Sequence, residues 1–196
     1  MSSAEVRDTS LRTLVLVAVL PPFLIGLAGF AHPARLTPEA ALFWRNLHVV
    51  FLPLLPILAL GPWLVTRAID RRVAWVVLAF GYVYACFYTA LDVLSGIGAG
   101  GLKYEGSEGL NVLFGLGGDL GQVGSIAFIF ATALAAGCVL RVAGVRGAPG
   151  TILVLVGAFG FMEEHVYPPW GVLSMMALAA GWALLVLSLR PAADAR

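Results

Sequence analysis

Residues 151–170 read TILVLVGAFGFMEEHVYPPW, and this stretch decides how many times the chain crosses a membrane. Its uncharged part, residues 151–162, is short, because a bilayer core needs roughly 20 apolar residues per helix. Glu163, Glu164 and His165 interrupt the apolar run, and the proline pair that follows ends any helix. Five other stretches of the chain are plainly long enough to cross. The choice is therefore between five spans and six.

The composition of the whole chain excludes a soluble protein. Of its 196 residues, 60% are hydrophobic and 12% are charged, and the mean hydropathy is +0.94. A soluble domain carries roughly a quarter charged residues. The net charge of +1 gives no basis for nucleic-acid binding, and the lone cysteines Cys86 and Cys138 form no metal or redox pair. The sequence predicts an all-α polytopic membrane bundle, a single integral domain over residues 1–196 with the lipid bilayer as its partner.

Basic residues decide between five and six spans, because they concentrate at the cytoplasmic ends of membrane helices. With six crossings, nine of the 12 basic residues lie on one side and only Arg35, Arg45 and Lys103 lie on the other. With five crossings, the two C-terminal arginines change sides and the bias weakens. The sequence therefore predicts six transmembrane helices in the cell membrane, with both termini cytoplasmic. The expected spans are residues 13–31, 47–66, 73–94, 120–140, 151–167 and 170–189.

All three histidines fall on the extracytoplasmic side in this topology. His32, His48 and His165 each lie near the outer end of a different span, so we expect them at similar depth. Imidazole and carboxylate groups are the usual ligands of zinc and of oxidised copper or iron. The sequence thus predicts a metal site built from the three histidines. A haem held by two of them is left open.

Asp92 lies inside an apolar span, where a carboxylate needs a partner or a function. It shares one helical face with small residues, which mark the side where membrane helices pack closely. We therefore expect Asp92 to point into the bundle. There it either pairs with Arg45 or Arg35, hydrogen-bonds Tyr88, or serves the site as a metal ligand or acid–base group.

Two further carboxylates are candidates for the same site. Glu164 shares a face with the glycines of its span and is expected to point inward as a ligand or acid–base group, whereas Glu163 is expected to face lipid headgroups. Asp119 and Gln122 have the spacing of a capping box, so Asp119 is either a helix cap or another ligand. The glycine-rich segment 96–111 is expected to form a flexible loop over the cluster.

These residues support one leading hypothesis and two alternatives. The leading hypothesis is a metal-binding site at the extracytoplasmic end of the bundle, with Glu164 and Asp92 as catalytic groups toward a small-molecule or lipid-like substrate. The first alternative is a cation- or proton-coupled transporter of small solutes that uses the same carboxylates. The second is a structural or assembly protein without a site. The sequence alone does not decide between enzyme and transporter, and it gives no oligomeric state.

Overall fold

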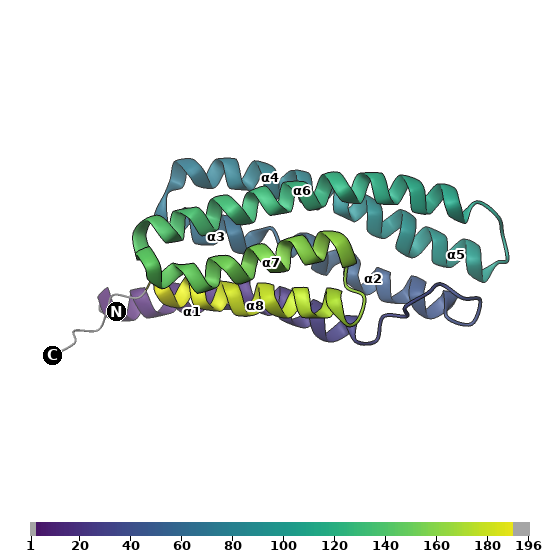
Figure 1. Ribbon diagram of the computed structural model, residues 1–196, viewed down its shortest axis with the longest axis horizontal. Helices are drawn as coiled ribbons and strands as arrows, with labels where there is room; N and C mark the ends of the chain where they lie inside the picture. The colour runs from purple at the N-terminus through teal and green to yellow at the C-terminus, as the bar shows by residue number, and fades with distance from the viewer. Residues whose placement is uncertain (1–2, 190–196) are drawn as a thin grey trace.

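The computed structural model describes residues 3–189, which form helices and short connections and contain no strand (Figure 1). The prediction for the two termini falls on chain ends that lie outside these residues, as do Arg190 and Arg196. The elements in chain order are α1 (Ser3–Gly29), α2 (Ala41–Ile57), α3 (Leu60–Ile69), α4 (Arg71–Leu91), the π-helix η1 (Asp92–Gly98), α5 (Ala99–Tyr104), α6 (Leu110–Ala143), the 3-10 turn η2 (Gly144–Gly147), α7 (Ala148–Glu164) and α8 (Trp170–Ser188).

Within the described chain, 5 helical stretches are long and apolar enough to span a membrane. They are Arg12–Gly29, Ala41–Ile69, Arg71–Tyr104, Leu110–Glu164 and Trp170–Ser188. The fourth stretch contains both α6 and α7, which fold back on each other at η2 (Figure 1). The all-helical, membrane-compatible bundle is thus confirmed. The count of six spans and the orientation stay predictions.

The predicted span 47–66 consists of two helices. Pro53 and Pro56 lie inside α2 and each lacks a backbone N–H, which weakens the hydrogen-bond ladder of the helix. The N–H groups of Leu58 and Ala59 then donate to carbonyls only three residues earlier, at 3.1 and 3.2 Å. The chain leaves α2 through this tight turn and enters α3.

The expectation of a flexible loop over residues 96–111 is wrong. α4, η1 and α5 run on without a break to Tyr104, and only residues 105–109 connect them to α6. A Cβ atom on Gly100 would lie 3.0 Å from the backbone nitrogen of Arg45 in α2. Gly100 therefore serves close helix packing, which is a common role of glycine in membrane helices.

Helices of different length create a step at one end of the bundle. α6 has 34 residues, which corresponds to about 51 Å at 1.5 Å per residue. α7 has 17 residues and α8 has 19. The long α6 and α5 extend beyond the ends of α7 and α1 in Figure 1. The turn after α1 and the turn between α7 and α8 lie at this step.

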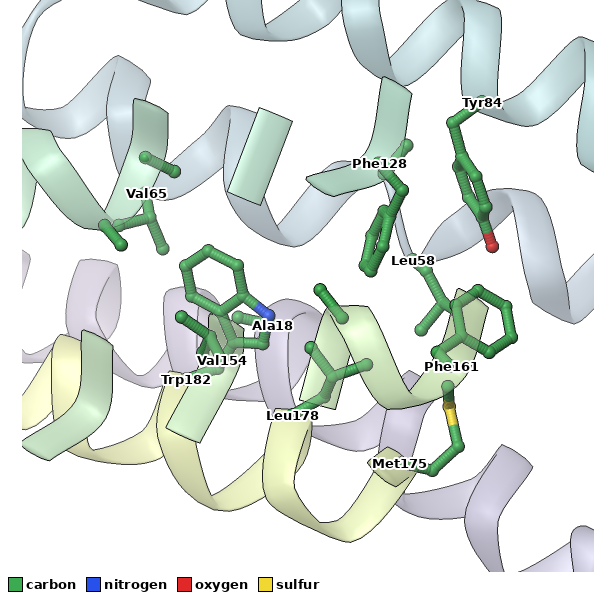
Figure 2. Packing of buried hydrophobic residues seen from close by; sticks show 14 of the residues in the cluster. Ala18, Leu58, Val65, Tyr84, Phe128, Val154, Phe161, Met175, Leu178 and Trp182 are labelled. Carbon is green, nitrogen blue, oxygen red and sulfur yellow. The ribbon is translucent and has the colours of Figure 1, made fainter. Parts of the chain in front are cut away.

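Aromatic and aliphatic side chains fill the interior of the helical bundle. Trp182 of α8, Phe128 of α6 and Phe161 of α7 are buried in this core (Figure 2), where the ring centroids of Phe128 and Phe161 lie 5.9 Å apart. The hydroxyl of buried Tyr84 in α4 donates a hydrogen bond of 2.9 Å to the carbonyl of Leu55 in α2. Apolar packing and a satisfied polar tip thus hold α4 against α2.

Replacement of Gly157 by alanine tests the contact between α7 and α8. The new Cβ would lie 2.7 Å from the backbone oxygen of Ser174, and overpacking of this kind costs about 1–3 kcal/mol. We expect Gly157→Ala to lower the thermal unfolding temperature of the detergent-purified protein. Gly137→Ala is the matched control, because a Cβ there meets nothing within 4 Å. Equal stability of the two variants would contradict this packing.

Candidate metal centre

Three segments far apart in the sequence bring the histidines together. His32 lies in the turn after α1, where its N–H donates to the Gly29 carbonyl at 3.0 Å. His48 lies on the second turn of α2, and His165 follows α7 directly. One nitrogen from each imidazole lies within 4.8 Å of the other two. The predicted proximity of the three histidines is confirmed.

The histidines are removed from solvent. His32 is 3% exposed and His48 is 2% exposed, while His165 is half-buried. The His32 ring centroid lies 5.1 Å from that of His48 and 5.9 Å from that of His165. The rings of Trp44 and Tyr167 lie 4.7 and 4.4 Å from His32. The cluster is therefore enclosed by aromatic side chains.

The Nδ1 atom of each imidazole has a hydrogen-bond partner. His32 Nδ1–H donates to the Pro33 carbonyl at 2.8 Å, and His48 Nδ1–H donates to the Trp44 carbonyl at 2.8 Å. Because a carbonyl only accepts, these bonds put the proton of the neutral ring on Nδ1 and leave a lone pair on Nε2. His165 Nδ1 and the Tyr88 hydroxyl share a hydrogen bond of 2.6 Å.

Two of the three Nε2 atoms, by contrast, lack a hydrogen-bond partner in the described chain. His32 Nε2 and His165 Nε2 are buried and have no hydrogen-bond partner among residues 3–189. A buried polar atom without a partner costs about 1–3 kcal/mol, so native structures rarely leave one. Two such atoms lie in one cluster, which makes these nitrogens the candidate ligand atoms of the site.

The electrostatics keep the imidazoles neutral. The pKa of His32 is lowered to about 4, mainly by burial; the hydrogen bond to the Pro33 carbonyl opposes this shift, and the nearby His48 adds a smaller lowering. A histidine with a lowered pKa is neutral at pH 7, and neutral imidazole is the form that binds metal ions.

His165 has an unusual backbone conformation. Its φ is 50° and its ψ is −123°, and its N–H still donates to the Phe161 carbonyl at 3.0 Å. A residue other than glycine in this region costs of order 1–3 kcal/mol, and such residues concentrate at functional sites. The conformation ends α7 and directs the chain toward Tyr167.

A close contact between α2 and η1 positions His48. A Cβ atom on Gly96 would lie 2.2 Å from His48 Cδ2, so only glycine leaves room for the imidazole here. The indole N–H of Trp44, one turn before His48, donates to the Ser95 carbonyl at 3.1 Å. The histidine therefore rests against the backbone of the π-helix.

Asp92 begins the π-helix and is fully buried, as the small-residue face predicts. It lies on the helix face between Tyr88, which bonds His165, and Gly96, which contacts His48. Neither carboxylate oxygen has a hydrogen-bond partner within the described chain, and Asp92 forms no ion pair with Arg45 or Arg35 there. Its carboxylate is not one of the atoms within 4.8 Å of one another.

The other two carboxylates lie elsewhere. The interpretation of Asp119 as a helix cap is wrong, because α6 begins at Leu110 and places Asp119, with an exposed side chain, inside the helix. Glu164 is exposed rather than inward, because α7 ends there and no further turn covers it. Neither residue belongs to the converging group.

A cavity of about 300 Å³ adjoins the histidine cluster between α4, α6 and α7. His165, Tyr88 and Tyr167 form its inner wall, and both Glu163 and Glu164 border it. The cavity thus connects a buried imidazole to the exposed outer end of α7. Its remaining lining residues are Leu91, Gly118, Gly121, Gln122, Ser125 and Met162.

Sequence reasoning missed the tyrosine of the site. The sequence suggested Tyr88 as a hydrogen-bond partner of Asp92, but its hydroxyl bonds the ring of His165. A signal was present, because Tyr88 stands four residues before Asp92 and therefore on the same helical face. The partner on α7 is invisible in the sequence, since 77 positions separate the two residues.

Tyr88→Phe tests the hydrogen bond to His165. The change leaves His165 Nδ1 buried without a partner, which costs about 1–3 kcal/mol. We expect a lower thermal unfolding temperature of the detergent-purified protein. Tyr82→Phe is the control on the same helix, because Tyr82 is 69% exposed. If both variants unfold like the unmodified chain, the bond does not stabilise the bundle.

A scan against protein-family models finds no match to this chain, and searches of curated proteins and of solved structures find none either. The functional assignment therefore rests on the residues of this chain and their geometry.

Proposed function

We propose that this chain is a membrane protein that binds a divalent transition-metal ion, zinc or copper, through His32, His48 and His165. The observation that carries the proposal is the set of hydrogen bonds at Nδ1, which leaves the other ring nitrogens of three clustered imidazoles free. Metal-bound histidines usually donate their second N–H to a carbonyl or another acceptor, and this fixes both tautomer and ring orientation. His32 and His48 have this second bond to a carbonyl, and His165 has it when its Nδ1–H donates to the Tyr88 oxygen.

The distances between the imidazole nitrogens require the rings to move when an ion binds. Zinc holds imidazole nitrogens at about 2.0–2.1 Å, which places ligand atoms of a tetrahedral site roughly 3.3 Å apart. The nitrogens here lie up to 4.8 Å apart, so the imidazoles must turn toward the ion when it binds. The direct packing of the rings, with centroids 5.1–6.0 Å apart, favours a single ion. A haem needs a flat slot between its axial imidazoles, and the aromatic rings around His32 occupy that space.

Asp92 supplies the charge that such a site needs. Three neutral imidazoles leave the charge of a dication uncompensated, and an uncompensated charge is costly inside an apolar bundle. Asp92 is the one acidic residue with a fully buried side chain in the described part of the chain. We assign it the role of counter-charge to the ion.

The site belongs at the extracytoplasmic end of a bundle with six crossings. Arg12, Arg67, Arg71, Arg141 and Arg146 lie at the helix ends opposite to the histidines, on α1, α3, α4, α6 and η2. Arg35, Arg45 and Lys103 lie toward the histidine end. The positive-inside rule then assigns the arginine-rich end to the cytoplasm. α6 and α7 count as two crossings in this topology.

Three protein ligands leave a coordination position for water or a substrate. A zinc ion held there would lower the pKa of a bound water to about 7 or would polarise an oxygen of a substrate. Asp92 and Glu164 are the candidate proton acceptors, the first buried on the face of α4 and η1, the second in the wall of the cavity beside His165. A small-molecule or lipid-like substrate would enter through this cavity.

Metal analysis of the detergent-purified protein tests the assignment. We expect a stoichiometric transition metal in the unmodified chain and its loss in His48→Ala, because His48 is buried in the centre of the cluster. Cys86→Ala controls for binding by an exposed thiol and should keep the metal. Thermal unfolding of each variant verifies that it is folded. A folded, metal-free chain that takes up neither zinc nor copper would overturn the proposal and favour the transporter hypothesis.

Asp92→Asn tests the counter-charge separately. Asparagine keeps the size of the side chain and removes its charge, so we expect metal affinity to fall by about 10- to 100-fold, as for partners of metal ligands elsewhere. Competition with a chromophoric chelator measures the affinity. Asp119→Asn is the matched control on the exposed face of α6. An unchanged affinity in Asp92→Asn would remove Asp92 from the site.

A further inference from the structure

The arginine-rich end of the bundle contains a second feature that the metal site does not use. Trp63, Arg67, Arg71 and Trp75 follow one another at intervals of four residues. α3 and α4 form a hairpin at Asp70, so the first two residues come from one helix and the last two from the other. Together with buried Ala74 they line a cavity of about 120 Å³.

The charges of this cavity are not compensated within it. The guanidinium of Arg67 lies over the ring of Trp63, 5.3 Å from the ring centroid. Neither Arg67 nor Arg71 pairs with a carboxylate in the described part of the chain. The nearest acid, Asp70, accepts hydrogen bonds from the N–H groups of Arg72 and Val73 and pairs with Arg141 at 3.2 Å. Two cations therefore face an open cavity.

The arrangement of the four side chains is amphipathic. Arg67 and Arg71 lie next to the hairpin turn, and each tryptophan lies four residues deeper in its helix, which is about 6 Å along the axis. A ligand that enters from the helix ends meets two guanidinium groups first and two indole rings below them. Guanidinium groups bind phosphate oxygens, and indoles prefer the interface between headgroups and acyl chains.

We propose that this cavity binds the headgroup of an anionic phospholipid, with the phosphate at Arg67 and Arg71 and the glycerol–acyl region between Trp63 and Trp75. Tryptophans that merely anchor a helix at the membrane surface need neither a cavity between them nor two unpaired arginines at its mouth. Free phosphate offers the same anionic group but has no apolar part for the indoles to contact. Basic pockets between membrane helices on the cytoplasmic side are known sites for anionic headgroups. The inference does not depend on the metal site.

Native mass spectrometry of the detergent-purified chain, titrated with phosphatidylglycerol, tests the proposal. One basic residue near a membrane surface contributes about 1 kcal/mol to the binding of anionic lipid, so the double variant Arg67→Gln/Arg71→Gln should bind roughly 30-fold more weakly. Arg72→Gln is the matched control, because Arg72 is exposed on the same helix and does not line the cavity. Its affinity should equal that of the unmodified chain.

Two further titrations separate the lipid from other ligands. Phosphatidylcholine with the same acyl chains carries no net charge and should bind at least tenfold more weakly than phosphatidylglycerol. Inorganic phosphate should not compete with bound phosphatidylglycerol at equal concentration. Equal binding of the two lipids, an equal loss in Arg72→Gln, an unchanged affinity in the double variant, or displacement by inorganic phosphate would each overturn the proposal. All substituted arginines are exposed, and thermal unfolding verifies that the variants are folded.

Discussion

The hydrogen bond between Tyr88 and His165 joins α4 to the end of α7 at the point where the three histidines lie together. The bonds of His32 and His48 are local, to carbonyls one and four residues away. The bond to Tyr88 crosses 77 positions and connects α4 to the end of α7. It satisfies one polar atom of the His165 imidazole, and it joins the end of α7 to α4, which continues into η1 with Asp92 and Gly96. The position of the His165 ring in the cluster depends on this contact.

Apolar surroundings give the cluster its chemistry. In water, three imidazoles near pH 7 would be partly protonated and would repel a cation. Enclosed by Trp44, Tyr167 and neighbouring rings, they stay neutral, since charging a buried group is unfavourable. The same burial makes the unpaired Asp92 costly. The two imidazole nitrogens that lack partners in the described chain are the feature on which the proposed metal site rests.

The two ends of the bundle have opposite chemistry. At one end, short helices stop beside longer ones, and this step holds the histidines, the buried carboxylate and the acidic cavity. At the other end, the hairpin of α3 and α4 presents arginines between tryptophans. A membrane supports both, because its apolar core needs no polar partners and its two surfaces differ in charge. The polar residues of the chain are therefore few and concentrated at the ends.

The sequence by itself determined the class of protein, the helical segments and the residues worth considering, because apolar run length and helical periodicity are local properties. The small residues that share a helical face with Asp92 were sufficient to predict that Asp92 is buried. Only the tertiary structure decided the rest. It placed Gly96 under His48 within a helix rather than a loop, put Asp119 in the middle of α6, exposed Glu164, and brought Tyr88 to His165. These outcomes depend on where each helix begins and ends and on which helices pack against each other. Contacts between segments that are distant in the sequence leave no periodic pattern in a single sequence.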